Sequence, residues 1–359
     1  MNINLSSKRL EFAKKAFVTR NADLSNVSKM RSDLAPSAGD LCLARIEKLG
    51  HHRRLELCSG RRSRLFIGDE ILVAFGNRYA TDQFHSVVPD NLDSCSLVAA
   101  GGIASSLQTR HSGTRVPTRI KPIGLLCDKE GNVLNLKKWA IQGEKSTKLI
   151  MPHLITVVGS GMNAGKTTTV SSLIRTAKKN QLNVGAIKIT GTGAGGDLWF
   201  YKDSGADFAL DFTDAGYSTT VGLSLDELLD IARKLYREAA QNCDIVIAEL
   251  ADGLYQSETA ALLASAAFQE MLDSIVFATG DSMAAGAGVQ HLAALGYTTA
   301  AISGAVTASE LARIEAESAA GVPALSVENF ENQEDALMIS MRSAFPVLEF
   351  GNDKLAAGF

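Results

Sequence analysis

Apolar and polar residues follow two different patterns along the chain, and the change comes near residue 150. Before it, short alternating segments such as L-C-L-A-R-I-E-K-L (41–49) and S-R-L-F-I-G-D-E-I-L-V-A-F (63–75) are separated by Ser59-Gly60 and Gly68-Asp69. This spacing is typical of short strands joined by tight turns. After it, apolar runs of strand length alternate with segments of helical period, which indicates βαβ units and a parallel sheet.

The first part of the chain is predicted to contain a smaller β-rich domain. Residues 1–35 are polar and basic with a helical pattern that ends near Pro36, so a helical segment is expected over 1–38. The spacing of strands over about 39–90 favours a small, strongly bent antiparallel sheet or barrel. Residues 91–150 continue irregularly, and we group them with these strands as a barrel-like domain over 39–150.

Residues 151–359 are predicted to form an α/β domain with a doubly wound, mostly parallel sheet. The expected strands are 154–158, 184–189, 244–250, 274–279, 298–302 and 323–327. Helices are expected at 167–179, 224–240, 259–267 and 308–320. In the first helix, Val170, Leu173, Ile174 and Ala177 form one apolar stripe, and Ser224 precedes the second as part of an S-x-x-E capping box.

A phosphate-binding loop is predicted in V-V-G-S-G-M-N-A-G-K-T-T-T at 157–169, between the strand 154–158 and a helix. Glycines allow backbone N–H groups to turn toward a phosphate, and the helix N-terminus and lysine add positive charge. The spacing is G-x5-G-K-T, one residue longer than the consensus. The alternative is a flexible glycine turn with an incidental Lys-Thr. The predicted nucleotide-binding residues are Gly159, Gly161, Asn163, Ala164, Gly165, Lys166, Thr167 and Thr168.

Lys188 and Asp197 are the predicted catalytic residues. Lys188 ends an apolar strand, and ligands of open α/β sheets bind beyond the carboxyl ends of strands, so its ammonium is expected near the phosphates. A lysine that reaches solvent from a strand end is the alternative. The loop T-G-T-G-A-G-G-D at 190–197 brings Asp197 to the same edge, either to hold Mg²⁺ or accept a proton, or else to cap a helix that begins at Leu198.

A magnesium ion is expected to bind Thr167 and Glu249. Thr167 follows the loop lysine, and Glu249 is the one carboxylate near the C-terminal end of the apolar segment 244–250. A buried carboxylate without a partner would be costly, and Mg²⁺ bound to a triphosphate supplies one. Asp252 is the competing candidate. No N-K-x-D guanine motif occurs, so ATP is preferred as the nucleotide, with GTP not excluded.

Composition limits the remaining classes of function. A net charge of -3 gives no global bias toward nucleic acid. The five cysteines form no C-x-x-C pair, and neither an apolar export signal nor an apolar run of about 18 residues is present, so we expect a cytoplasmic protein without membrane spans.

One basic cluster, H-H-R-R at 51–54 with R-R-S-R at 61–64, is expected on a hairpin, as either an anion-binding patch or a solvated face.

The P-loop segment, V-G-A-I-K-I-T at 184–190 and D-I-V-I-A-E-L-A-D-G at 244–253 together resemble a SIMIBI-type class of P-loop NTPases. This class contains dethiobiotin synthetase and the molybdopterin-guanine dinucleotide biosynthesis protein B, and G-D-L-W-F-Y-K-D-S-G-A at 196–206 is similar to a segment of the latter. No proline follows Lys188 and no histidines follow Thr190, so neither specific activity is carried over. The resemblance covers about 151–260 and does not reach the first 150 residues.

The resemblance implies a role for Lys188 between the γ-phosphate and an acceptor, and it implies a homodimer. Three functions are compatible with the sequence. The first is an ATP-dependent, Mg²⁺-dependent kinase or ligase that phosphorylates or activates a small acidic metabolite. The second is a nucleotide-hydrolysing adaptor or switch in cofactor biosynthesis. The third, which rests on the basic cluster alone, is a nucleic-acid-associated ATPase.

Overall fold

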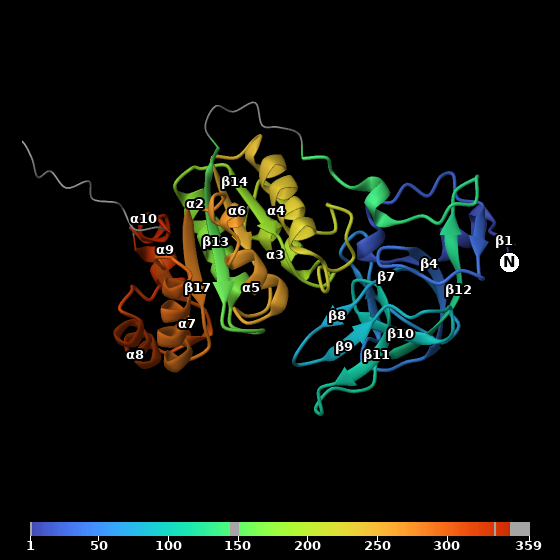
Figure 1. The fold of residues 1–359 in the computed structure, drawn as a ribbon, viewed down its shortest axis with the longest axis horizontal. Coiled ribbons are helices and arrows are strands. Elements are labelled where there is room, and N and C mark those ends of the chain that lie inside the picture. The colour runs from blue at the N-terminus through green and yellow to red at the C-terminus, as the bar shows by residue number, and fades with distance from the viewer. Residues whose placement is uncertain (1, 144–150, 334, 345–359) are drawn as a thin grey trace, which may run out of the picture.

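In the computed structural model, which describes residues 2–143, 151–333 and 335–344, the two halves of the chain contribute strands to separate sheets (Figure 1). The expected boundary at residue 150/151 falls in the segment 144–150, and the expected domain end at 359 falls in 345–359; both lie outside the described residues. No helix among the described residues is long and apolar enough to span a membrane.

The N-terminal half folds around a closed ring of strands. Its strands are β1 (Asn2–Asn4), β2 (Lys14–Lys15), β3 (Lys29–Arg31), β4 (Leu41–Lys48), β5 (Arg54–Glu56), β6 (Arg62–Arg64), β7 (Glu70–Phe75), β8 (Arg78–Tyr79), β9 (Phe84–Val87), β10 (Cys95–Ala99), β11 (Ile103–Arg110) and β12 (Thr118–Cys127). The strand β12 pairs with β4, β4 with β7, β7 with β11, β11 with β10, and β10 again with β12. Apolar side chains of these strands form one core, and the barrel-like architecture expected from the alternation is therefore present.

The helical segment expected over residues 1–38 is wrong for most of its length. Only α1 (Ser7–Phe12) and the 3-10 turn η1 (Phe17–Thr19) are helical there. The strands β1 and β3 pair with each other, and β3 also pairs with β12, so this segment extends the sheet. Burial of Leu10, Phe17 and Met30 against the barrel core overrides the weak helical period of the sequence. A second 3-10 turn, η2 (Leu136–Trp139), follows the barrel.

The C-terminal half contains a parallel sheet of order β15-β14-β16-β13-β17-β18 within the described residues. Its strands are β13 (His153–Gly159), β14 (Val184–Lys188), β15 (Phe208–Asp211), β16 (Ile245–Glu249), β17 (Ser274–Ala278) and β18 (Ala301–Ser303). The central strand β13 precedes the glycine loop, and its neighbours β16 and β17 place their carboxyl ends beside that loop. The predicted doubly wound α/β fold is confirmed.

Helices cover both faces of this sheet (Figure 1). They are α2 (Lys166–Lys179), α3 (Gly196–Asp203), α4 (Leu225–Ala240), α5 (Ser257–Leu263), α6 (Ala266–Gln269), α7 (Ser282–Ala294), η3 (Ala305–Ala308), α8 (Glu310–Ala320), α9 (Val327–Asn332) and α10 (Ala336–Ser340). The capping box at Ser224 and the buried stripe of α2 are observed as expected.

Two predicted elements need correction, and one further strand was missed. The helix expected at 259–267 is two short helices, α5 and α6. The strand expected at 323–327 makes only a single bridge, Ile302 to Ala324, because the capping residue Ser326 starts α9 directly after it. The strand β15 lies at the sheet edge and was missed, because its apolar run is only three residues long, Phe208 to Leu210, between two aspartates.

The two halves contact each other through the loops around α3. Glu56 of β5 accepts hydrogen bonds from the Gly195 N–H (3.0 Å) and the Trp199 indole N–H (3.0 Å). The backbones approach so closely near Gly101 that an added Cβ would lie 2.2 Å from the Gly193 carbonyl oxygen. The two halves are therefore joined here by buried hydrogen bonds and by a close approach of their backbones.

Candidate nucleotide-binding site

The glycine loop has the strand–loop–helix context that phosphate binding requires. The strand β13 ends at Gly159, and α2 begins at Lys166. Asn163 (φ 62°) and Gly165 (φ 96°) adopt left-handed conformations, which turn successive N–H groups toward one side of the loop. The N–H groups of residues 161–165 donate to no backbone carbonyl within the described residues. The loop therefore offers unused donors beside a helix N-terminus.

Lys166 lies inside this loop. Its ammonium donates to the carbonyl oxygens of Gly161 (2.8 Å) and Asp252 (2.7 Å). Burial lowers the pKa of Lys166, the charge of Lys188 adds to this effect, and the carboxylates of Glu249 and Asp252 oppose it. A bound phosphate would favour the charged ammonium and would compete with the two carbonyls for its protons.

A cavity of about 430 Å³ opens beside the loop at the carboxyl edge of the sheet. Its lining contains nearly all the predicted site residues: Met162, Asn163, Gly165, Lys166, Thr167, Thr168, Lys188, Asp197, Glu249, Ala251 and Asp252. Of the predicted nucleotide-binding residues, Gly159, Gly161 and Ala164 belong to the loop without lining the cavity. Residues expected on four separate segments are thus brought together around one space.

Lys188 joins the two carboxylates predicted for the chemistry. Its ammonium donates to one oxygen of Glu249 (3.1 Å) and to Asp197. Burial disfavours the ammonium, but the charges of Asp197 and Glu249 outweigh burial and raise the pKa of Lys188. Burial likewise opposes ionisation of Asp197, and the charge of Lys188 outweighs it, so the pKa of Asp197 is lowered. The pKa shifts of Lys188 and Asp197 both favour the charged forms of this ion pair, and Lys188 does not extend into solvent.

Asp197 does not cap its helix. The cap position of α3 is Gly195, and Asp197 lies in the first turn, where it accepts a hydrogen bond from the Thr167 hydroxyl (3.2 Å). The same helix carries Tyr201 one turn later, and its hydroxyl donates to the second oxygen of Glu249 (2.6 Å). Tyr201 was missed from the sequence, although its i, i+4 spacing from Asp197 places both on one helix face.

Oxygen donors suited to Mg²⁺ are present around the cavity. Thr167, Asp197, Glu249 and Asp252 all line it, and Mg²⁺ is usually held by a few protein oxygens together with phosphates and water. Glu249 is engaged at both oxygens, whereas the Asp252 carboxylate accepts no hydrogen bond within the described residues. Burial raises the pKa of Asp252, against the charges of Lys166 and Lys188. A cation near Asp252 would therefore stabilise its ionised form.

The N-terminal half also reaches the loop, which the sequence pattern did not indicate. Asn163 donates from its side-chain amide to Asp82 (3.1 Å), which lies in the turn between β8 and β9. No local signal predicts this contact, because it depends on how the two halves of the chain pack. The basic hairpin is formed as expected by β5 and β6, with Arg54 opposite Arg64.

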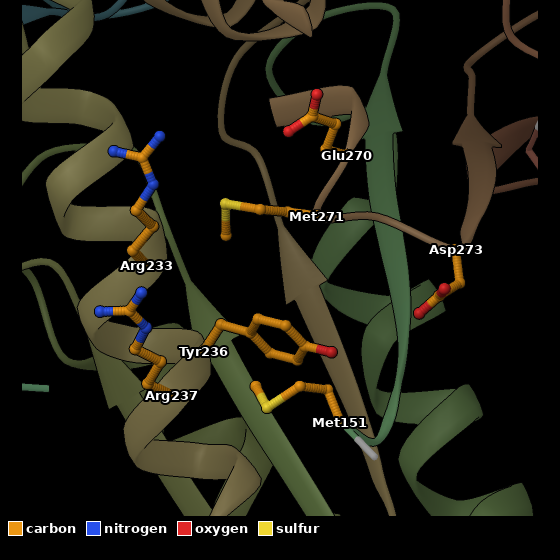
Figure 2. Close-up of a pocket in the computed structure, with 7 residues that line it drawn as sticks. All are labelled: Met151, Arg233, Tyr236, Arg237, Glu270, Met271 and Asp273. Carbon is orange, nitrogen blue, oxygen red and sulfur yellow. The ribbon is translucent and has the colours of Figure 1, made fainter. Parts of the chain in front are cut away.

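A second cavity, of about 500 Å³, lies at the opposite edge of the sheet, where β13 and β17 begin (Figure 2). Arg233, Tyr236 and Arg237 of α4 face Met151 and Met271 across it. The Tyr236 hydroxyl donates to the Pro152 carbonyl oxygen (2.6 Å) and is thereby fixed. This cavity is remote from the glycine loop and is not part of the candidate site.

No protein-family model and no curated protein matches the chain. Among solved structures, the signal recognition particle 54 kDa protein of Aeropyrum pernix in complex with GDP is 17% identical, with a TM-score of 0.37 over 52% of this chain and 45% of that chain. The receptor FtsY of Elizabethkingia anophelis in complex with GDP is 17% identical, with a TM-score of 0.32 over 47% of this chain and 54% of that chain.

Chloroplast FtsY of Physcomitrella patens is 14% identical, with a TM-score of 0.32 over 53% of this chain and 62% of that chain. The chain therefore spans about half the length of the solved proteins that it matches. Likenesses of this extent assign no function. The loop geometry, the parallel sheet and the separate barrel themselves define the architecture: a P-loop NTPase fold preceded by a β-rich domain.

Proposed function

We propose that this protein is a Mg²⁺-dependent P-loop NTPase that transfers the γ-phosphoryl group of a nucleoside triphosphate to a small acidic metabolite. The supporting observation is the convergence of Lys166, Lys188, Asp197, Glu249 and Asp252 on one cavity beside unused loop N–H groups. Two lysines at such a site favour a reaction in which negative charge moves between phosphate and acceptor.

Each residue has a distinct part in this proposal. The loop N–H groups and Lys166 hold the nucleotide phosphates, and Lys188 stabilises the charge that develops during transfer. Thr167, with Glu249 or Asp252, would hold Mg²⁺, which neutralises phosphate charge when bound. Asp197, hydrogen-bonded to Thr167 and ion-paired with Lys188, would accept the acceptor's proton in this proposal.

A nucleotide-hydrolysing switch is the second candidate, and α3 favours it. The first turn of this helix supplies Asp197 to the cavity, and Gly195 just before it is bonded to Glu56 of the barrel. A movement of α3 on loss of the γ-phosphate would therefore also move its contact with the N-terminal half. The nucleic-acid function still rests on the basic hairpin alone. A homodimer remains a proposal from the sequence resemblance.

The proposal is tested with the purified full chain. Consumption of Mg-ATP and Mg-GTP is followed by mass spectrometry with and without a pool of small carboxylates and phosphates. We expect one acceptor to accelerate nucleotide loss and to gain a phosphoryl group. Acceptor-independent hydrolysis would instead favour the switch.

Lys166→Ala should remove nucleotide binding, because the ammonium contacts ligand rather than core. Its control is Lys179→Ala, an exposed lysine of the same helix whose ammonium meets only the Glu331 carbonyl oxygen. Unchanged affinity of Lys166→Ala in calorimetric titration contradicts the phosphate-loop assignment.

A further inference from the structure

Buried polar atoms without partners gather at one place in the N-terminal half. Within the described residues, the buried side-chain atoms that lack a hydrogen-bond partner are His52 Nδ1, Arg78 Nε and Nη1, Asp82 Oδ1, Ser86 Oγ and two separate threonine hydroxyls. All but the threonine hydroxyls thus come from four residues around the β8–β9 hairpin. Buried polar groups are nearly always paired, so a concentration of unpaired ones points to an absent ligand.

The hairpin explains why these groups lie together. Arg78 of β8 is directly opposite Ser86 of β9, so their side chains share one face of the pair. Phe84 lies two residues before Ser86 on that face, with its ring centre 5.7 Å from the Arg78 guanidinium and 5.8 Å from the His52 ring. The arginine and the histidine therefore both lie near one aromatic ring, and the serine lies on the same face of the strand pair.

Arg78 has the charge and the free donors of an anion site. Its residue surface is only 8% exposed, and Nη2 donates to the Gln83 side-chain oxygen (2.8 Å), which leaves Nε and Nη1 unused. Burial lowers the pKa of Arg78 to about 10, although the charges of Asp82 and Asp252 oppose this. A buried guanidinium with two free nitrogens is strongly stabilised by an oxyanion.

This cluster adjoins the nucleotide cavity. Asp82, in the turn of the hairpin, accepts a hydrogen bond from Asn163 of the glycine loop (3.1 Å). Burial raises the pKa of Asp252, which lines the cavity. The charge of Arg78 opposes this rise, because the guanidinium favours the ionised carboxylate. The residue before Arg78, Asn77, donates to the Val221 carbonyl oxygen (3.2 Å) of the α/β half and fixes the hairpin there.

We propose that Arg78 and Ser86, beside the His52 ring, form a subsite for one oxyanion group, a carboxylate or a phosphate, at the edge of the nucleotide cavity. This inference rests on the proposed function, because it supplies the place where the terminal phosphate or the acidic acceptor is held. Either the terminal phosphate of the nucleotide or a separate anion can supply this oxyanion group, and the test distinguishes the two.

The test compares the wild-type full chain with Arg78→Met by calorimetric titration of ADP, of a non-hydrolysable ATP analogue with Mg²⁺, and of inorganic phosphate, which is titrated both with and without ADP. Charge-assisted hydrogen bonds of this kind account for about 10-fold to 100-fold in affinity. A loss of that size for the ATP analogue alone identifies the terminal phosphate. A loss for inorganic phosphate alone identifies a separate anion. Unchanged affinity for all three overturns the subsite.

Control variants separate binding from folding. Arg119→Met removes an exposed arginine of the same barrel and should change none of the three affinities. If Arg78→Met does not fold, Arg78→Lys and Ser86→Ala are measured instead, and unchanged affinities in both overturn the subsite. A wild type that binds inorganic phosphate through Arg78 but neither nucleotide would contradict the proposed function and retain the subsite. A wild type that binds none of the three contradicts both.

Discussion

Lys188 neutralises two carboxylates that would otherwise repel each other. With 12% of its side chain exposed, it lies between Asp197 and Glu249, whose side chains are 32% and 2% exposed. Removal of a partner from a buried ion pair leaves uncompensated charge and is destabilising by several kcal/mol. A fall in stability alone therefore does not separate a structural lysine from a catalytic one.

For Lys188→Met we expect near-normal nucleotide affinity and a loss in kcat of about 10²–10³-fold, the effect of deleting one preorganised donor. Lys178→Met is the control, since Lys178 pairs only with Asp207 on the surface. The measurement is the rate per folded molecule, with the folded fraction taken from thermal unfolding. A destabilised variant with an unchanged rate would show that Lys188 is structural.

The two candidate metal ligands differ in their surroundings. Glu249 is held by Lys188 and Tyr201, while Asp252 faces the cavity. We expect Glu249→Gln to retain nucleotide binding and to lower turnover by orders of magnitude, because the amide keeps the shape but removes the charge. Asp252→Asn is measured beside it as a function of Mg²⁺ concentration. If only Asp252→Asn raises the Mg²⁺ requirement, Asp252 is the ligand.

His52 should make the stability of the fold depend on pH. Burial, followed by the charges of Arg78 and His51, lowers the pKa of His52 to about 3 from 6.5. Between these values the unfolded chain binds a proton that the folded chain does not, so the free energy of unfolding decreases by about 1.4 kcal/mol for each unit by which the pH is lowered. The free energy of unfolding is measured by denaturant at pH 7 and at pH 5. The loss between the two pH values should be about 2 kcal/mol smaller in His52→Gln than in the wild type. Equal losses in the two proteins would contradict a neutral, buried His52.

At the scale of elements, α3 depends on a contact from the other half of the chain. Glu56, with 1% of its surface exposed, accepts from both the Gly195 N–H and the Trp199 indole. In Glu56→Gln one of these donors meets an amide NH₂, so we expect a loss of about 1–3 kcal/mol in the free energy of unfolding. The control Glu47→Gln breaks only a surface pair with Arg119 and should cost below about 1 kcal/mol. Similar costs in both variants would show that Glu56 does not fix α3.

The sequence predicted the elements whose signals are local. The strand β13, the glycine loop and α2 follow from an apolar run, a motif and a helical stripe, and Lys188 and Glu249 follow from their places at strand ends. The segment 1–38 was misassigned because its strands exist only through pairing with β12. Tyr201 was missed because it belongs to no motif and its partner Glu249 is 48 residues away. Arg78 was missed because its burial depends on how the β8–β9 hairpin packs in the folded chain.

At the scale of the whole molecule, the candidate site depends on both halves of the chain. The α/β half supplies the phosphate loop and the charged cluster, and the barrel supplies Asp82 to the loop and Glu56 to α3. Arg20 adds a buried ion pair across the same boundary, to Asp214 (2.7 Å). The geometry of the cavity therefore reflects how the halves pack as well as the P-loop fold itself.

Gly101→Ala tests this packing directly. The added Cβ would lie 2.2 Å from the Gly193 carbonyl oxygen and 2.7 Å from Ala194 Cα, and neither backbone atom can rotate away. We expect lower thermal stability and weaker nucleotide binding, with the secondary structure of both halves retained by circular dichroism. Gly68→Ala is not a matched control, because the positive φ of Gly68 would strain an alanine. Gly161→Ala is the control for the stability measurement, since open space surrounds its added Cβ. A variant as stable as the wild type would show that the halves are not held this closely.

The contact between Gly101 and Gly193 also determines which substitutions this boundary can accept. Main-chain atoms are the same in every amino acid, so the distance between the halves is set there independently of the side chains around it. The polar contacts of Glu56 and Arg20 hold the halves together in addition to this backbone contact. Positions 101 and 193 can gain no carbon atom, because a Cβ at 193 would lie 2.6 Å from the Ser218 carbonyl oxygen. Related chains that keep this arrangement should therefore keep both glycines.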